Sequence, residues 1–217
     1  MVWLSNLQKE TLLKVDEMIE QNKTFDEIVW KLQKENYYFK CETKNGYTKK
    51  LLDSFLSAAK NEYDVRIIDC YKLMPKPCIH CGKCETADLC VFDDLDEYNA
   101  LLNEAEALVF ASPVYNLSVP APLKALIDRS QRYFSKRFSL GIKPPIKKHK
   151  KAILLLTCGS NDRSGFEIIE KQLSRMFTII NTELFGKVSI AETDKIKDTT
   201  ECERQAYELA KSLADIV

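Results

Sequence analysis

This sequence of 217 residues lacks an excess of charge, a long apolar run and a recognisable leader. Lys plus Arg and Asp plus Glu both number 32, so the formal net charge is zero. A balanced charge argues against a nucleic-acid partner and an anionic membrane surface, since both require a basic excess. No stretch approaches the run of about 18 apolar residues that spans a bilayer, and the first residues do not read as a signal peptide. We therefore expect a cytoplasmic protein without a membrane or nucleic-acid partner.

Internal repeats and low-complexity segments are also missing, and the chain instead alternates between two kinds of apolar pattern. Strands are predicted at 37–41, 65–69, 107–112, 151–157 and 183–190, and helices at 48–60, 94–104, 122–134, 165–179 and 199–216. The third and fourth of these strands are continuously apolar, as a sheet buried on both faces requires. The alternation predicts an α/β protein with a doubly wound, five-stranded parallel sheet.

Residues 1–36 precede the first predicted strand and have the pattern of a helical extension. Ser5 with Gln8 and Thr24 with Glu27 match capping boxes, and apolar residues follow each box at helical spacing. The segment carries acidic as well as basic residues, so it lacks the basic excess of a DNA-binding helix-turn-helix. We expect a helical hairpin that packs on the domain or on a partner subunit, with residues 37–217 forming the main domain.

Eight cysteines are present, and four of them lie in one loop predicted at 74–93. Cys78, Cys81, Cys84 and Cys90 have the spacing C-x2-C-x2-C-x5-C, whereas the other four are scattered singly. In a reducing compartment such clustering favours metal binding over disulfides. Thiolates at this spacing converge from one compact loop, which favours a [4Fe–4S] cluster. The alternatives are unligated thiols and a structural zinc site, although zinc sites usually have two Cys pairs separated by a longer stretch.

Further motifs make this pattern more specific. The cysteines are followed by Asp93-Asp94, then by Ser112-Pro113-Val114-Tyr115 and by the run from Leu123 to Arg129. Together these motifs, within residues 37–190, resemble the iron–sulfur flavoprotein family, which consists of flavodoxin-like proteins related to NAD(P)H-dependent FMN reductases. The resemblance implies FMN beside a [4Fe–4S] cluster, a homo-oligomer (dimer or tetramer), and electron transfer between the two centres.

Ligands of doubly wound sheets bind outside the carboxyl ends of the strands, and three loops here leave such ends. The expected cofactor contacts are Lys44, Asn45 and Thr48 in the first loop, Ser112, Pro113, Val114, Tyr115 and Asn116 in the second, and Thr157, Cys158, Gly159 and Ser160 in the third. The second loop would flank the flavin ring, and Gly159 would let the backbone approach it closely. The cysteine loop is expected at the edge of the same cleft.

The predicted phosphate loop departs from the family pattern. That loop usually reads Gly-Ser-Pro-Arg before a Thr, whereas this chain has Lys40-Cys41-Glu42-Thr43-Lys44 there, and Glu42 adds a negative charge. The two lysines and the amides of a helix beginning at Thr48 still favour an anion. Two interpretations follow: FMN binds in an altered pocket, or the cleft has been reshaped for another ligand.

No convincing nucleophile or pair of carboxylates suggests acid–base catalysis, and the catalytic residues are not identified. The predicted function is an oxidoreductase that passes electrons between FMN and a [4Fe–4S] cluster, with NAD(P)H or a protein as electron donor or acceptor. The alternatives are a cluster-containing enzyme with an FMN-free cleft that acts on another ligand, and a cluster-based redox sensor.

Overall fold

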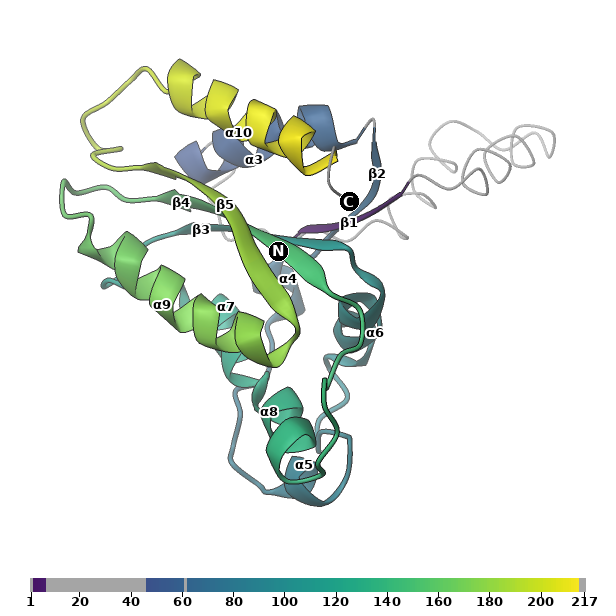
Figure 1. The fold of residues 1–217 in the computed structure, drawn as a ribbon. Helices are drawn as coiled ribbons and strands as arrows, with labels where there is room; N and C mark the ends of the chain where they lie inside the picture. Colours follow the sequence, from purple (N-terminus) through teal and green to yellow (C-terminus); the bar gives the residue numbers. More distant parts are fainter. Residues whose placement is uncertain (1, 7–45, 61, 215–217) are drawn as a thin grey trace, which may run out of the picture.

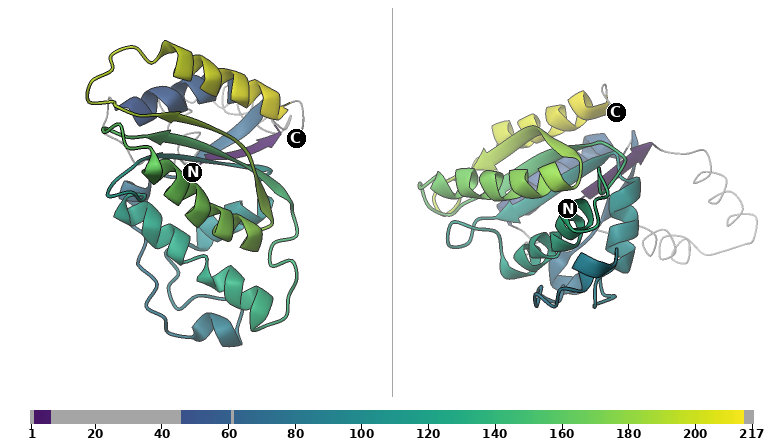
Figure 2. Two further views of the ribbon diagram at one scale, coloured as in Figure 1. Left: turned by 60° about the vertical axis from the view of Figure 1, so that its left-hand side comes forward. Right: turned by 60° about the horizontal axis from the view of Figure 1, so that its bottom comes forward.

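The computed structural model describes residues 2–6, 46–60 and 62–214, which form a sheet with helices on both faces (Figure 1 and Figure 2). The strands are β1 (Val2–Asn6), β2 (Tyr63–Ile67), β3 (Ala107–Pro113), β4 (Lys150–Thr157) and β5 (Thr182–Ile190). The helices are α3 (Tyr47–Ala59), α4 (Cys70–Leu73), α5 (Lys83–Thr86), α6 (Asp96–Glu104), α7 (Ala121–Asp128), α8 (Gln131–Phe138), α9 (Ser164–Ile179) and α10 (Thr200–Ala214). Within these ranges no helix is both long and apolar enough to cross a bilayer.

The sheet has the strand order β2-β1-β3-β4-β5, and β3, β4 and β5 form its parallel part. Ala107 of β3 pairs with Lys151 of β4, and Thr157 at the end of β4 pairs with Ile190 of β5. Four of the five strands therefore lie within about two residues of their predicted positions, the usual accuracy for element ends. Their carboxyl ends meet at one edge of the sheet, where the proposed cofactor loops begin.

The fifth strand differs from the prediction. β1 lies between β2 and β3 and runs antiparallel to both, with Val2 opposite Ile67 and Val109. The predicted helical extension is therefore wrong for residues 2–6, and the sheet is mixed instead of wholly parallel. Pairing along both edges satisfies the backbone N–H and C=O groups of β1, which outweighs a local capping pattern. The strand predicted at 37–41 and the rest of the predicted extension lie outside the described residues.

A separate apolar core covers each face of the sheet. Leu108 and Phe110 of β3 point into the core under α6, α7 and α9, where the rings of Phe110 and Phe177 lie 5.5 Å apart. Val109 points the other way, into the core that α3 and α10 cover. Alternate residues of one strand enter opposite cores because side chains alternate across a strand. This is the doubly wound α/β arrangement that the sequence predicts.

The single helix predicted at 122–134 is divided into α7 and α8. α7 ends at Asp128, and α8 begins at Gln131 after a turn at Arg129 and Ser130. The Ser130 carbonyl accepts hydrogen bonds from the next helix, through the N–H groups of Tyr133 and Phe134. The turn brings the side chain of Arg129 beside the cysteine loop.

Arg129 ties both ends of the cysteine loop to the helix layer. Its side chain is almost fully buried, and one guanidinium nitrogen donates to the Lys76 carbonyl at 2.9 Å. The other donates to Asp94 Oδ1 at 2.9 Å and to the Phe92 carbonyl at 3.4 Å. The second oxygen of Asp94 accepts a hydrogen bond from the Lys76 amide at 2.8 Å. One ion pair thus fixes the start and the end of the loop.

The same contacts change the pKa of Asp94. Burial alone would raise it, but the hydrogen bonds from Arg129 and the Lys76 amide, with the charges of both side chains, hold the pKa of Asp94 below its ordinary value. A lowered pKa means that the pair contributes its full stability above the unfolded pKa of about 3.9 and loses it as the pH falls through the lower folded value.

We predict that Arg129→Met lowers the free energy of unfolding by about 1–3 kcal/mol, because it leaves the half-buried Asp94 carboxylate and the Lys76 and Phe92 carbonyls without their shared hydrogen-bond donor. Lys124→Met is the matched control, since the ion pair between Lys124 and Asp128 is exposed and contributes about 0–1 kcal/mol. Urea unfolding at about pH 7 and about pH 3 measures both effects. The stability difference between wild type and Arg129→Met should shrink at the lower pH. Equal losses in the two variants would contradict this role of Arg129.

Candidate functional site

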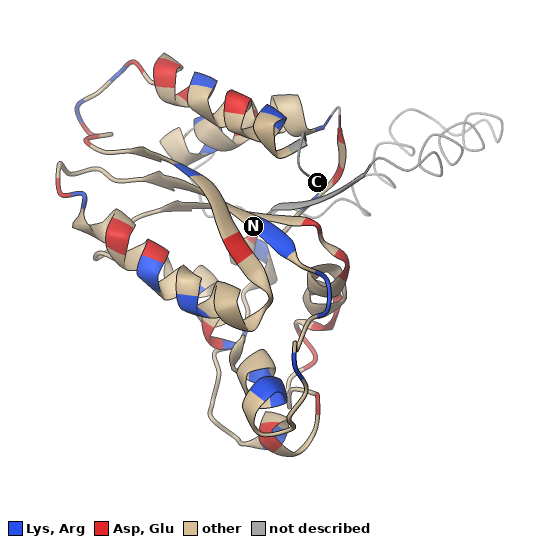
Figure 3. Ribbon diagram, in the orientation of Figure 1, with Lys and Arg blue, Asp and Glu red and all other residues tan. Residues whose placement is uncertain are grey.

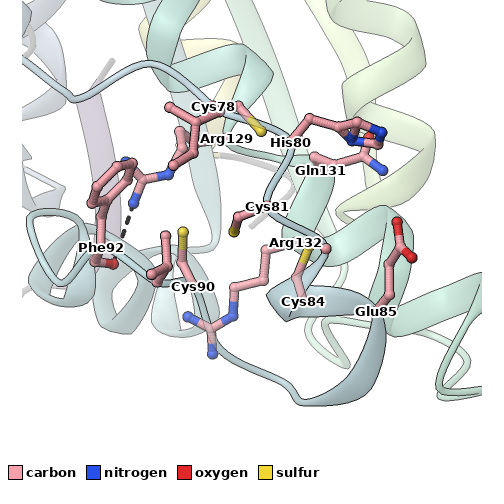
Figure 4. Close-up of a pocket in the computed structure, with 13 residues that line it drawn as sticks. Cys78, His80, Cys81, Cys84, Glu85, Cys90, Phe92, Arg129, Gln131 and Arg132 are labelled. Atoms are coloured by element: carbon pink, nitrogen blue, oxygen red, sulfur yellow. Dashed lines mark hydrogen bonds between the residues drawn. The ribbon is translucent and has the colours of Figure 1, made fainter.

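The four cysteines of the motif line one pocket. Cys78, Cys81, Cys84 and Cys90 surround it together with residues of the α7–α8 turn (Figure 4). Cys78 and Cys81 are exposed, whereas Cys84 and Cys90 are half-buried. None of the seven cysteines in the described part of the chain forms a disulfide. The spacing of the motif therefore does what the sequence predicts and brings four thiols to one place.

The loop backbone turns sharply between the second and third cysteines. Gly82, the N-cap of α5, has a φ of 73°, which lies in the left-handed region that glycine adopts without strain. A Cβ on Gly82 would meet no atom within 4 Å, so a steric clash does not explain glycine here. The positive φ angle of the backbone does. α5 then carries Cys84 in its first turn. Glycine at this position lets Cys81 and Cys84 face the same pocket.

The potential metal ligands that line this pocket are mainly thiols. Within the described ranges, no three His, Cys, Asp or Glu side chains come close enough together to hold one metal ion. The side chains that converge are four thiols, and thiolates are the ligands of Fe–S clusters. The donor chemistry of these residues is therefore the kind that an iron–sulfur cluster uses.

Basic residues of α8 lie beside the cysteine loop (Figure 3). Arg132 donates to the Asp88 carbonyl at 2.7 Å and lies 3.2 Å from its carboxylate, and Lys136 pairs with the same carboxylate at 2.6 Å. Arg129 and Arg132 both line the pocket. Two guanidinium groups therefore lie at the pocket, and each of them pairs with a carboxylate of the cysteine loop or its end, Asp94 or Asp88.

A second cleft, of about 330 Å³, lies at the carboxyl ends of β3 and β4. Its lining consists of Gly46, Tyr47, Thr48, Pro113, Val114, Tyr115, Thr157, Gly159, Thr193 and Asp194. Its volume is within the range of small-molecule sites, about 300–1,000 Å³. The cleft shares no lining residue with the cysteine pocket. The cysteine loop therefore contributes no lining residue to this cleft, and it contacts α8 through Asp88.

Six of the predicted cofactor contacts line this cleft: Thr48, Pro113, Val114, Tyr115, Thr157 and Gly159. Lys44 and Asn45 lie outside the described residues. Ser112, Asn116, Cys158 and Ser160 do not line it, each for a local reason. The Ser112 hydroxyl is buried and donates to the Pro113 carbonyl, and the Cys158 sulfur lies 3.4 Å from the Ser160 hydroxyl inside their own loop. Asn116 is at the tip of a tight turn, with a φ of 50°.

That tight turn presents Tyr115 to the cleft. The N–H of Tyr115 donates to the Ser118 carbonyl at 2.8 Å, and the N–H of Ser118 donates back at 2.9 Å. Between them, Asn116 and Leu117 both have positive φ angles, as a two-residue hairpin turn requires. Tyr115 is 51% exposed, so its ring is available as a wall for a ligand.

The first turn of α3 forms the polar end of the cleft. The Thr48 and Thr157 hydroxyls are 2.6 Å apart and buried, which joins the start of α3 to the end of β4. α3 has no side-chain cap at Gly46 and no acidic residue in its first turn. The positive end of the helix dipole is therefore open to an anion in the cleft.

The sequence reasoning missed four lining residues. Gly46 and Tyr47 lie at the start of α3, and Thr193 and Asp194 follow the carboxyl end of β5. The N–H of Thr193 donates to the Cys158 carbonyl at 3.0 Å, which holds the two loops together. A Cβ on Gly159 would lie 2.6 Å from Asp194 Oδ2, so the absence of a side chain there permits this close approach. The rule that ligands bind outside strand ends would have found Thr193 and Asp194 had it been applied to β5.

Comparison with known proteins agrees with this geometry. The family model of NADPH-dependent FMN reductases matches residues 41–193. The iron–sulfur flavoprotein of Methanosarcina thermophila is 32% identical over 149 residues, which cover 65% of this chain and 72% of the relative. An iron–sulfur flavoprotein of Archaeoglobus fulgidus is 37% identical over 92 residues, or 42% of each chain.

Among solved structures, the NAD(P)H:quinone oxidoreductase from Methanothermobacter marburgensis shares the fold. Its TM-score is 0.56 at 17% identity, and the match covers 79% of this chain and 89% of that chain. The family model spans well over half of the sequence and includes the cysteine loop and every lining residue of the cleft except Asp194. This chain therefore belongs to the NADPH-dependent FMN reductase family and, within it, to the iron–sulfur flavoproteins.

Proposed function

We propose that this chain is a flavin-dependent oxidoreductase that holds FMN in the cleft and a [4Fe–4S] cluster in the cysteine pocket, and that it passes electrons between them. The observation that carries the proposal is the gathering of all four motif cysteines on one pocket in a chain of this family. When bound, FMN links two-electron to one-electron chemistry, and the cluster carries single electrons. NAD(P)H or a protein partner supplies or accepts these electrons.

The cleft residues suit FMN in a definite orientation. The Thr48 hydroxyl and the N-terminus of α3 bind the phosphate, because the first turn of the helix has no acidic residue. Asp194 lines the same cleft, next to Gly159. The Tyr115 ring and the Pro113 backbone flank the flavin ring. The chain's own residues thus bind and orient the cofactor and leave the redox chemistry to it.

A homo-oligomer is part of this proposal, and exposed aromatic side chains on α8 support it. On α8, the helix beside the cysteine pocket, Phe134 and Phe138 are 44% and 56% exposed, and their rings lie 4.5 Å apart. Exposed aromatic side chains next to each other favour a protein contact. We predict that light scattering gives a mass of at least two chains, and that Phe138→Asp lowers it. A monomeric wild-type protein would contradict this proposal.

We predict that Cys81→Ala abolishes cluster binding without affecting the flavin. Cys81 is exposed, so the substitution removes a ligand at little cost to folding. In anaerobically purified protein, iron and sulfide should fall to background while FMN per chain stays unchanged. Cys202 is a half-buried cysteine on α10, so Cys202→Ala is the matched control. This variant should keep its iron, its sulfide and its FMN. Iron retained by Cys81→Ala would argue against the four-cysteine site.

We predict that Thr48→Val weakens FMN binding about tenfold to a hundredfold, as expected for the loss of one hydrogen bond to a charged group. Riboflavin has no phosphate, so it should bind the wild-type protein and Thr48→Val with equal affinity. Thr48→Ser keeps the hydroxyl and should bind FMN like wild type. Fluorescence titration of the apoprotein gives all of these dissociation constants. If Thr48→Val weakens both flavins equally, the hydroxyl supports the fold through Thr157 and does not bind phosphate.

A further inference from the structure

A buried serine faces one of the predicted cluster ligands. Ser135 on α8 is only 1% exposed, and its Oγ lies 3.4 Å from the Sγ of Cys84. Its backbone carbonyl accepts hydrogen bonds from Ser139 and Leu140 at the end of the helix. Its hydroxyl has no such role in the helix. A polar side chain at a buried position requires a hydrogen-bond partner, and here the recorded partner is a sulfur.

Two other helical serines, Ser174 and Ser212, behave differently. The Ser174 hydroxyl donates to the Glu170 carbonyl at 2.7 Å, and the Ser212 hydroxyl donates to the Glu208 carbonyl at 3.0 Å. Both follow the usual pattern, in which a helical serine bonds back to the preceding turn. Ser135 is directed toward the cysteine loop instead. Its hydroxyl therefore serves the contact between α8 and α5, not the helix itself.

Two charged contacts keep this serine opposite Cys84. Arg132 and Lys136 lie on either side of Ser135 in the sequence, and both pair with Asp88 of the cysteine loop. These pairs hold the loop against the face of α8 that carries Ser135. The ion pairs of Asp88 with Arg132 and Lys136 therefore hold the Ser135 hydroxyl near the Cys84 sulfur.

The direction of the hydrogen bond depends on the state of the sulfur. A neutral thiol donates its proton to Ser135 Oγ. A thiolate ligand has no proton, so it only accepts, and the hydroxyl must donate to it. Because Ser135 is buried, water does not compete for this bond. Hydrogen bonds to the sulfurs are one of the features that set the reduction potential of an Fe–S cluster.

We propose that Ser135 is a positioning residue that donates its hydroxyl hydrogen to the Cys84 sulfur and thereby raises the reduction potential of the cluster, an inference that rests on the proposed function. The reduced cluster carries one more negative charge than the oxidised cluster, so a donor stabilises the reduced state more. Of the four motif cysteines, Cys84 has this contact, whereas Cys78 and Cys81 are exposed to solvent. The effect is therefore directed at one ligand.

The test compares Ser135→Ala with Ser139→Ala, an exposed serine at the end of the same helix. Both proteins are purified anaerobically, their iron and sulfide are quantified, and the cluster is titrated with a reductant at controlled potential. At the wild-type midpoint, the ratio of reduced to oxidised cluster should fall about tenfold in Ser135→Ala, a shift of about 59 mV for one electron. Ser139→Ala should match wild type. An unchanged midpoint in Ser135→Ala would overturn the role of Ser135.

Ser135→Thr and Ser135→Val separate the effect of the hydroxyl from the effect of side-chain shape. Threonine and valine have nearly the same shape, but only threonine has a hydroxyl. If Ser135→Ala does not retain a cluster, retention of the cluster by Ser135→Thr but not by Ser135→Val supports the donor role. Loss of the cluster from both variants overturns that role, as does a cluster with the same midpoint potential in both. A wild-type protein without iron and sulfide would overturn the proposed function as well, whereas a loaded protein insensitive to Ser135 overturns this inference alone.

Discussion

The ion pair between Arg129 and Asp94 determines where the cysteine loop lies. Its hydrogen bonds reach Lys76 before the cysteines and Phe92 after them, so one buried charge closes both ends of the loop. Apolar packing contributes little there, since Ile79 and Val91 are more than half exposed. The pocket therefore depends on charged and polar contacts. Removing one of them affects the position of all four thiols.

The cleft at the ends of β3 and β4 is built in a different way. Its walls are loops at the ends of buried parallel strands, and the hydroxyl pair of Thr48 and Thr157 joins α3 to β4 at its base. Strand ends in a packed sheet are held rigidly, which suits a cofactor that must be oriented closely. The cysteine pocket and this cleft share no lining residue.

Features that depend on local pattern could be predicted from the sequence. Continuous apolar runs identified β3 and β4, and the motif spacing identified the four cysteines that gather on one pocket. Features that depend on distant partners could not. β1 was predicted as helix because its capping signal is local, whereas its pairing with β2 and β3 is not. The turn between α7 and α8, the approach of Asp194 to Gly159, and the contact of Ser135 with Cys84 likewise arise only when separate segments meet.

The most direct test of the account is to quantify iron, acid-labile sulfide and FMN on one anaerobically purified sample of the wild-type protein. The account predicts about four iron, about four sulfide and about one FMN per chain. Zinc in place of iron would contradict the cluster. Iron and sulfide without FMN, even after the protein is incubated with added flavin, would contradict the flavin site and indicate a cleft for another ligand.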